Sequence, residues 1–251
     1  MQARTIEKDL LRIKKIIDEI ASNYEIIVVV DGSGDKTFQN AKKIRSQKIH
    51  TYGYPTNHGK GYAIRYGMAR SKGKIIAFLD AGMDLHPKGL EMLLTILEAT
   101  RADIVIGSKL HPQSKVNYPW QRKLISFVYR SMVKVLFGLS IRDTQVGMKV
   151  FRRNVLQDVL PRLLVKRYAF DIEILAVAHR LGYTKIKEAP VTLTFRHWSS
   201  ITSKNFLHII FRMLWDTAAV FYRLQILRYY DNSSKRKWRY DPELDFRVNV
   251  G

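Results

Sequence analysis

The sequence predicts an α/β fold in which a mostly parallel sheet is flanked by helices. Apolar runs rich in β-branched residues are typical of strands buried on both faces, and the chain has three of them, at 25–30, 74–79 and 103–107. Segments with helical periodicity separate these runs, and strands that alternate with helices form parallel crossovers. Such sheets bind ligands at the carboxyl ends of their strands. The polar residues at these three ends are Asp31, Asp80 and Ser108.

The remaining elements follow from periodicity and from loop-forming residues. Ile6, Leu10 and Ile13 recur at helical spacing with charges between them, which predicts an amphipathic helix over about 4–21. Further helices are expected near 37–46, 61–71, 87–100, 119–137, 170–181 and 204–230, and shorter strands near 49–53 and 185–194. We expect one domain over 1–200, followed over 201–251 by an amphipathic helix and a basic, loosely ordered tail.

Composition narrows the class of partner. The 251 residues include 43 Lys and Arg against 22 Asp and Glu, which gives a formal charge of +21. This excess favours anionic partners: nucleic acid, lipid headgroups or phosphorylated small molecules. The chain has no Cys, so disulfides and Cys-ligated zinc are excluded. No apolar run approaches the roughly 18 residues that span a bilayer, so we expect a soluble or peripheral protein.

Two glycine-containing segments have the composition of nucleotide-binding loops. Asp31, Gly32 and Ser33 follow a strand, and the carboxylate is suited to accept a hydrogen bond from a nucleobase N–H or a ribose hydroxyl. Gly59 and Lys60 stand where a helix begins, and there exposed N–H groups, the helix dipole and a lysine favour a phosphate. The alternative is an ordinary turn and an ordinary glycine-rich helix start.

Another strand end carries the candidate metal ligands. Carboxylate oxygens there are suited to Mg²⁺ or Mn²⁺, and a bound ion would neutralise the charge of a diphosphate. The predicted ligands are Asp80, Asp84 and His86, with Gly82 between the two carboxylates. The competing interpretation is a turn in which Asp84 caps the following helix.

One polar segment interrupts an apolar stretch: Asp-Thr-Gln-Val-Gly-Met-Lys-Val-Phe at 143–151. A polar group removed from water without a partner costs about 2–7 kcal/mol, so these side chains require a ligand, a metal or one another. Upstream, Arg122 and Ser126 lie one helical turn apart and are able to face one anion. A solvated basic helix face is the alternative for them.

In this order the motifs resemble those of the family 2 glycosyltransferases, in the branch of dolichyl-phosphate mannosyltransferases and other polyprenyl-phosphate glycosyltransferases. The matches are Asp-Gly-Ser, Asn-x-Gly-Lys-Gly, the cluster at Asp80, Asp-Thr-Gln-x-Gly-x-Lys and a late Arg-x-x-x-Ser. The resemblance implies a GT-A type, Rossmann-like fold. It also implies inverting transfer of mannose or glucose from a GDP- or UDP-hexose to a polyprenyl phosphate. Arg196 and Ser199 would then belong to a loop that closes over the donor diphosphate.

The same resemblance assigns roles on the acceptor side. Asp143 and Gln145 are expected to shape the reaction centre. Arg122 and Ser126 are expected to receive the acceptor phosphate.

The chain departs from the family pattern at two places. Gly82 stands where the family's Asp-x-Asp motif has its second carboxylate, which alters the predicted metal ligation. The apolar strand that precedes the first helix in the family is absent here. Because that strand is normally central, we expect a gap in the sheet, and we expect either a native start upstream or a fragment.

The helix at 204–230 carries basic residues beside an apolar and aromatic surface, which is typical of an interfacial helix on an anionic bilayer. Packing on the rest of the chain or in a homo-oligomer is the alternative. We expect a peripheral protein at the cytoplasmic membrane face. Two other functions stay open: the same fold with a soluble glycan acceptor, and a basic non-catalytic nucleic-acid-binding protein. The strand-end carboxylates disfavour nucleic acid because without a metal they would repel phosphates.

Overall fold

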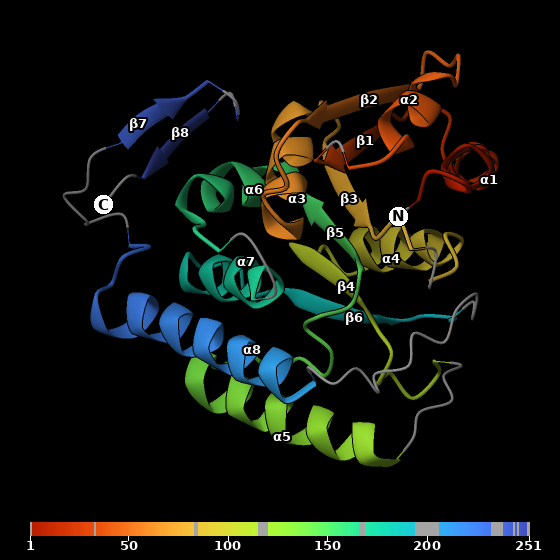
Figure 1. Cartoon of the computed structure of the whole chain (residues 1–251). Helices are drawn as coiled ribbons and strands as arrows, with labels where there is room; N and C mark the ends of the chain where they lie inside the picture. Colours follow the sequence, from red (N-terminus) through yellow and green to blue (C-terminus); the bar gives the residue numbers. More distant parts are fainter. Residues whose placement is uncertain are drawn as a thin grey trace.

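The computed structural model describes residues 2–32, 34–82, 85–114, 120–165, 169–193, 206–231, 238–242, 244 and 246–249. For 120–126, 206–210, 238 and 246–249 the backbone alone is described. The α/β class predicted from the sequence is confirmed: apart from one strand pair near the C-terminus, strands occupy the middle of the molecule and helices lie on both sides (Figure 1).

Four strands form the larger sheet. β5 (Met148–Arg152) pairs antiparallel with both β3 (Ile75–Leu79) and β4 (Ile104–Ser108), and β4 pairs in parallel with β6 (Ile186–Pro190). The order is therefore β3-β5-β4-β6. β5 runs opposite to its neighbours and begins within the polar segment 143–151. The sequence patterns predict no strand there.

A second, two-stranded sheet stands apart from the first. β1 (Ile26–Asp31) pairs in parallel with β2 (Ile49–Tyr54), and among the described residues no strand joins β1 to β3, as the expected gap requires. All five residues of β4 are buried, whereas those of β1 are half-buried and β3 alternates. The prediction of strands buried on both faces is therefore right for β4 and wrong for β1 and β3, since an edge without a partner strand stays accessible.

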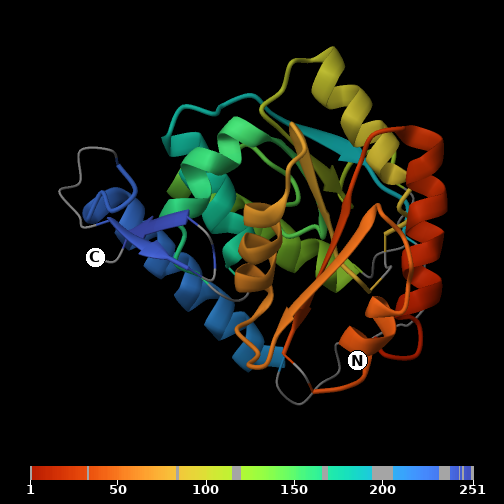
Figure 2. The same cartoon turned by 90° about the horizontal axis from the view of Figure 1, so that it is seen from above.

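Helices cover both faces of the sheets (Figures 1 and 2). One side carries α1 (Ile6–Ile20), α2 (Thr37–Lys42) and α4 (Gly89–Ala99). The other side carries α3 (Lys60–Arg70), α6 (Arg153–Val159), a 3₁₀ turn (Leu160–Arg162) and α7 (Phe170–Arg180). Beyond α7, α5 (Trp120–Phe137) and α8 (Phe206–Phe221) run side by side, and α8 continues in a π-helical turn (Tyr222–Ile226).

The main hydrophobic core surrounds the four-stranded sheet and α7. Every residue of α7 from 170 to 178 is buried, as expected for a helix enclosed on all sides. Val220 and Tyr230 belong to the same core, so α8 is packed onto it. A smaller cluster that includes Ile6 and Ala41 holds α1 and α2 against β1.

The chain beyond 231 contains regular structure. β7 (Trp238–Asp241) and β8 (Phe246–Asn249) form an antiparallel pair, Leu244 between them is buried, and β8 contacts the 3₁₀ turn. The expectation of a loosely ordered tail is therefore wrong for these residues. Among the described helices, none combines the length and the apolar character of a membrane span.

Candidate active site

Asp31, at the end of β1, is engaged by the backbone of the loop that precedes α3. Its Oδ1 accepts a hydrogen bond from the His58 N–H at 2.7 Å, and its Oδ2 accepts one from the Gly59 N–H at 2.9 Å. Gly59 has a φ of +95°, which favours glycine. Asp31, which we expect to bind the nucleoside, thus holds this loop in place.

The other residues of the two predicted nucleotide loops lie close by. A Cβ at Gly32 would lie 3.1 Å from the Asn57 backbone nitrogen, so this glycine permits the two loops to meet. A Cβ at Gly61 would lie 2.7 Å from the Val165 carbonyl oxygen, so Gly61 serves the packing of α3. Ser33 lies outside the described residues.

Lys60, the first residue of α3, forms ion pairs with two carboxylates. Its Nζ lies 3.1 Å from Oδ2 of Asp80 and 3.2 Å from Oδ2 of Asp171. The Lys149 ammonium donates to the other Asp171 oxygen at 2.6 Å and to the Val146 carbonyl at 2.6 Å. We call Lys60, Asp80, Lys149 and Asp171 the charge cluster; it joins the carboxyl end of β3 to the interior of β5.

The charge cluster runs from the core to solvent. The Lys149 side chain is 0% exposed, whereas that of Asp80 is 49% exposed. Burial lowers the pKa of Lys149, and the attraction of Asp171 acts against that shift. Burial also opposes the charged form of Lys60, but Asp171 and Asp80 outweigh it and raise its pKa. Both ammonium groups are therefore stabilised by carboxylates in place of water.

Gly147 allows Asp80 to occupy this position. The Asp80 N–H donates to the Gly147 carbonyl at 2.8 Å, and a Cβ at Gly147 would lie 2.1 Å from Asp80 Oδ2. No side-chain carbon tolerates such an approach. The glycine within 143–151 is therefore required by the neighbouring strand end and not by its own backbone angles.

Asp143 and Gln145 lie where the larger sheet meets α5 and α8. Asp143 Oδ2 accepts a hydrogen bond at 3.0 Å from the N–H of Lys109, which directly follows β4. Gln145 Nε2 lies 3.5 Å from the Tyr129 hydroxyl on α5 and 3.0 Å from the Met213 sulfur on α8. Asp143, Gln145 and Lys149 each have protein partners, as buried polar groups require, but apart from the Val146 carbonyl these partners lie outside the segment and are not the side chains of one another.

Of the predicted metal ligands, Asp80 offers a half-exposed carboxylate, the hard oxygen that Mg²⁺ and Mn²⁺ prefer. His86 has Arg12 Nη2 at 3.2 Å from its Nε2, and its Nδ1 accepts from the Lys88 N–H at 3.2 Å. With donors at both ring nitrogens, His86 is not a ligand in this conformation. Asp84 lies outside the described residues, within which no three His, Asp or Glu side chains gather as a metal site. Of the three predicted ligands, Asp80 is therefore the one described residue that presents an accessible carboxylate.

The side chains of the remaining predicted residues are not described. Arg122 and Ser126 belong to α5, but their side chains are not described, and Arg196 and Ser199 are not described at all. Sequence patterns did not predict that Asp171 forms ion pairs with two lysines. The available signal was a carboxylate in a helix whose neighbours are apolar, because a buried carboxylate requires a cation.

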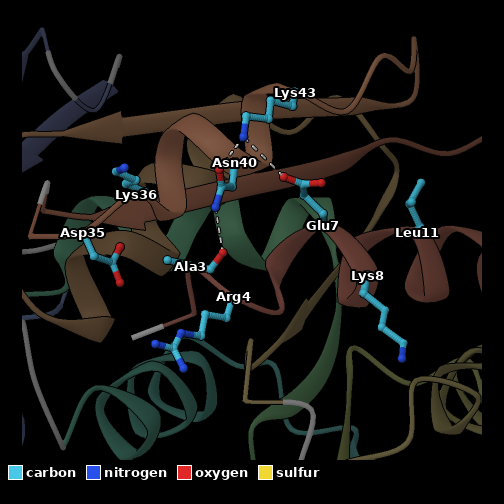
Figure 3. Close-up of a pocket in the computed structure, with 9 residues that line it drawn as sticks. All are labelled: Ala3, Arg4, Glu7, Lys8, Leu11, Asp35, Lys36, Asn40 and Lys43. Carbon is cyan, nitrogen blue, oxygen red and sulfur yellow. Dashed lines mark hydrogen bonds and ion pairs between the residues drawn. The ribbon is translucent and has the colours of Figure 1, made fainter.

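An open cavity of about 950 Å³ lies between the first turns of α1 and α2 (Figure 3). Two contacts frame it: the Asn40 amide donates to the Ala3 carbonyl at 2.7 Å, and the Lys43 ammonium lies 3.9 Å from Glu7. Cations outnumber carboxylates around it, so it is suited to an anionic group. Its charged lining consists of Arg4, Glu7, Lys8, Asp35, Lys36 and Lys43.

Comparisons with known proteins show the family to which the sequence is similar. The model of the family described as glycosyl transferase family 2 matches residues 7–160. Human dolichyl-phosphate beta-glucosyltransferase is 34% identical over 192 residues, which cover 72% of this chain and 57% of that protein. A dolichyl-phosphate beta-glucosyltransferase of Trichomonas vaginalis is 33% identical over 211 residues, which cover 80% of this chain and 63% of that protein. The chain thus spans less than two thirds of the length of these curated relatives.

Solved structures share the fold. Glucosyl-3-phosphoglycerate synthase from Mycobacterium tuberculosis, in complex with Mn²⁺, UDP and phosphoglyceric acid, superimposes with a TM-score of 0.63 at 20% identity. That match covers 99% of this chain and 82% of the other. Mannosyl-3-phosphoglycerate synthase from Rubrobacter xylanophilus has a TM-score of 0.65 at 17% identity, covering 96% and 78%. At these identities the likeness shows the fold, and the GT-A type expectation is confirmed.

Proposed function

The chain belongs to glycosyl transferase family 2, and from this premise we propose that it transfers a hexose from a nucleotide sugar to a polyprenyl phosphate, with inversion at the anomeric carbon. The names of the curated relatives favour glucose over mannose and a dolichyl-type acceptor. The UDP held by the solved neighbour favours UDP-glucose over a GDP-hexose.

One observation carries this proposal: the segment 143–151 contacts both the charge cluster and the two outer helices. Gly147 and Lys149 lie against or within the charge cluster, while Gln145 contacts α5 and α8. A lipid-linked acceptor requires such a junction, because its phosphate must reach the donor while its chain stays against apolar surface.

The proposed reaction does not require a strong general base. A polyprenyl phosphate is ionised at neutral pH, so positioning and charge neutralisation suffice. One phosphate oxygen would attack the anomeric carbon while the bond to the nucleoside diphosphate breaks. We assign Arg122 and Ser126 to the acceptor phosphate, and Asp143 and Gln145 to the reaction centre.

The donor side combines several loops at the sheet edge. The proposed nucleotide site consists of Asp31, Gly32, Ser33, Gly59, Lys60, Arg196 and Ser199. Mg²⁺ or Mn²⁺ at Asp80, with Asp84 as a second ligand, would supply neutralisation of the charge on the leaving diphosphate. Lys60 provides a second, tethered positive charge at the same place.

The test is transfer of labelled glucose from UDP-glucose to a polyprenyl phosphate, followed by extraction into organic solvent. We expect label in the organic phase, and about 10²–10³-fold less of it with Asp80→Asn, the loss seen when one stabilising group is removed. Asp18→Asn, which removes an exposed carboxylate on α1, is the control and is expected to keep full activity. Label that stays in water would favour a soluble glycan acceptor, and no consumption of any nucleotide hexose would overturn the proposal.

We also propose that α5 and α8 contact an anionic membrane at its cytoplasmic face, where the negative surface potential attracts basic segments. Large apolar side chains on both helices are exposed, including Trp215 at 68% and Val135 at 82%. Arg212 and Lys134 lie among them and are exposed as well. Pairing of two copies of the chain through the same surface is the alternative, so vesicle binding and oligomeric state are measured together. The further members of this apolar surface are Phe127, Val128, Phe211 and Leu214.

A further inference from the structure

The Lys60 ammonium occupies one side of the carboxylate that is the candidate metal ligand. Its Nζ lies 3.1 Å from Asp80 Oδ2, within direct ion-pair distance. The contact follows from the fold, because α3 begins and β3 ends at the same edge of the molecule. A divalent ion bound to this oxygen would meet an ammonium already in place.

Asp171 cannot fully neutralise Lys60, because it also serves a buried lysine. Lys149 is 0% exposed and lies 2.6 Å from one Asp171 oxygen, while Lys60 lies 3.2 Å from the other. Lys60 therefore relies on Asp80 as well, and the charge cluster of two lysines and two aspartates is neutral overall. A divalent ion at Asp80 would place two more positive charges close to Lys60, and like charges at such separations repel strongly.

Among the described residues, neither Gly82 nor Gly147 reduces the repulsion between Lys60 and an ion at Asp80. Gly82 brings no carboxylate to the strand end. Gly147 packs against Asp80 so closely that a Cβ there would lie 2.1 Å from Oδ2, which limits movement of the carboxylate toward β5. The Lys60 ammonium ends a long flexible side chain, so in the Lys60–Asp80 pair it is the group that is able to move away.

We propose that the Lys60 ammonium and a divalent cation are alternative occupants of the Asp80 carboxylate. Lys60 holds Asp80 in the free protein and so weakens metal binding. A donor diphosphate, if bound as in the proposed function on which this step rests, gives Lys60 a new anionic partner and opens Asp80 to the ion. Metal and nucleotide then strengthen each other's binding.

The competition itself is tested without nucleotide and without sugar transfer. Free Mn²⁺ is measured by electron paramagnetic resonance as MnCl₂ is titrated into the unmodified protein and into Lys60→Met. We expect Lys60→Met to bind Mn²⁺ at least about tenfold more tightly, the scale on which one nearby charge shifts a pKa. Asp80→Asn, combined with Lys60→Met, is expected to abolish this binding and so place the ion at Asp80.

Lys48→Met is the matched control. This substitution removes the same unit of charge and also breaks a Lys–Asp pair, since Lys48 Nζ lies 3.1 Å from Asp18 Oδ1. Lys48 lies beside the first residue of β1, at the end of that strand opposite to Asp31. Its Mn²⁺ affinity is expected to equal that of the unmodified protein. If Lys60→Met does not fold, Lys60→Gln, which keeps a hydrogen-bond donor for Asp171, is titrated in its place.

Equal or weaker Mn²⁺ binding in the folded Lys60 variant would overturn the proposal. So would tight binding that survives Asp80→Asn, or a gain of the same size in Lys48→Met. None of these outcomes depends on the acceptor or the sugar, so they are independent of whether the proposed transfer reaction is observed.

Discussion

Lys149 ties the polar segment 143–151 to the core. A fully buried charge without a partner is costly, and Asp171 together with the Val146 carbonyl provides its partners. Asp171 also holds Lys60, which holds Asp80. The buried Lys149–Asp171 ion pair thus positions the exposed Asp80 carboxylate through Lys60. Gly147 leaves the space that Asp80 occupies.

We predict that Gly147→Ala disrupts this arrangement. The added Cβ would overlap Asp80 Oδ2, so the carboxylate or the end of β3 must shift. We expect a loss of about 1–3 kcal/mol in the free energy of unfolding, as for other overpacked sites, together with at least about tenfold slower glucose transfer, about 1.4 kcal/mol in barrier height. Urea unfolding and the extraction assay measure the two effects.

Gly34→Ala is the control for this substitution. An added Cβ at Gly34 meets nothing within 4 Å, so stability and transfer are expected to stay unchanged. If Gly147→Ala behaved like Gly34→Ala, Gly147 would have no part in placing Asp80.

Among the elements, the two sheets differ in how firmly they are held. β4 is buried throughout and paired on both edges, whereas β1 is half-buried and pairs with β2 on one edge in the described residues. The core around the larger sheet is extensive, and the cluster under α1 and α2 is small. Since Asp31 ends β1 and Asp80 directly follows β3, the candidate nucleotide and metal residues span the boundary between the sheets.

We predict that the smaller sheet opens independently of the larger one. Local opening costs less free energy where few apolar contacts are broken, so amide protons of β1 and β2 are expected to exchange with deuterium faster than those of β4 and β5. Hydrogen exchange followed by peptide mass spectrometry measures this. Equal protection of all four strands would show that the two sheets open as one unit.

Local patterns and long-range partners differ in how well the sequence reveals them. Runs of β-branched residues and helical spacing predicted most elements, because these depend on neighbours in the chain. The strand β5 was not predicted, because it forms by antiparallel pairing with β3 and β4, which are distant in the sequence. In the site, Asp31 and Asp80 were expected at strand ends and lie there. Asp171 pairs with Lys60 although the two residues are 111 positions apart in the sequence. Patterns of local spacing do not predict such a pair.

At the scale of the whole molecule, charge and apolar surface combine on α5 and α8. The formal charge of +21 draws the protein toward anionic surfaces through a field that salt screens. The exposed apolar side chains of these two helices add an attraction that salt does not screen. The ring stack of Phe211 and Trp215 lies in this surface, with centroids 6.3 Å apart. Gln145 contacts the same two helices, so these helices connect the surface to the reaction segment.

We predict that the protein floats with vesicles that contain anionic lipid and not with neutral ones. High salt is expected to weaken this binding, and the double variant Phe211→Ser with Trp215→Ser is expected to weaken it further at every salt concentration, because it removes apolar contact and no charge. Met92→Ser, which changes an exposed apolar residue on α4, is the matched control and is expected to float normally. If the double variant floats normally while light scattering shows a dimer converted to a monomer, the surface joins two copies of the chain, and the acceptor lipid must approach by another route.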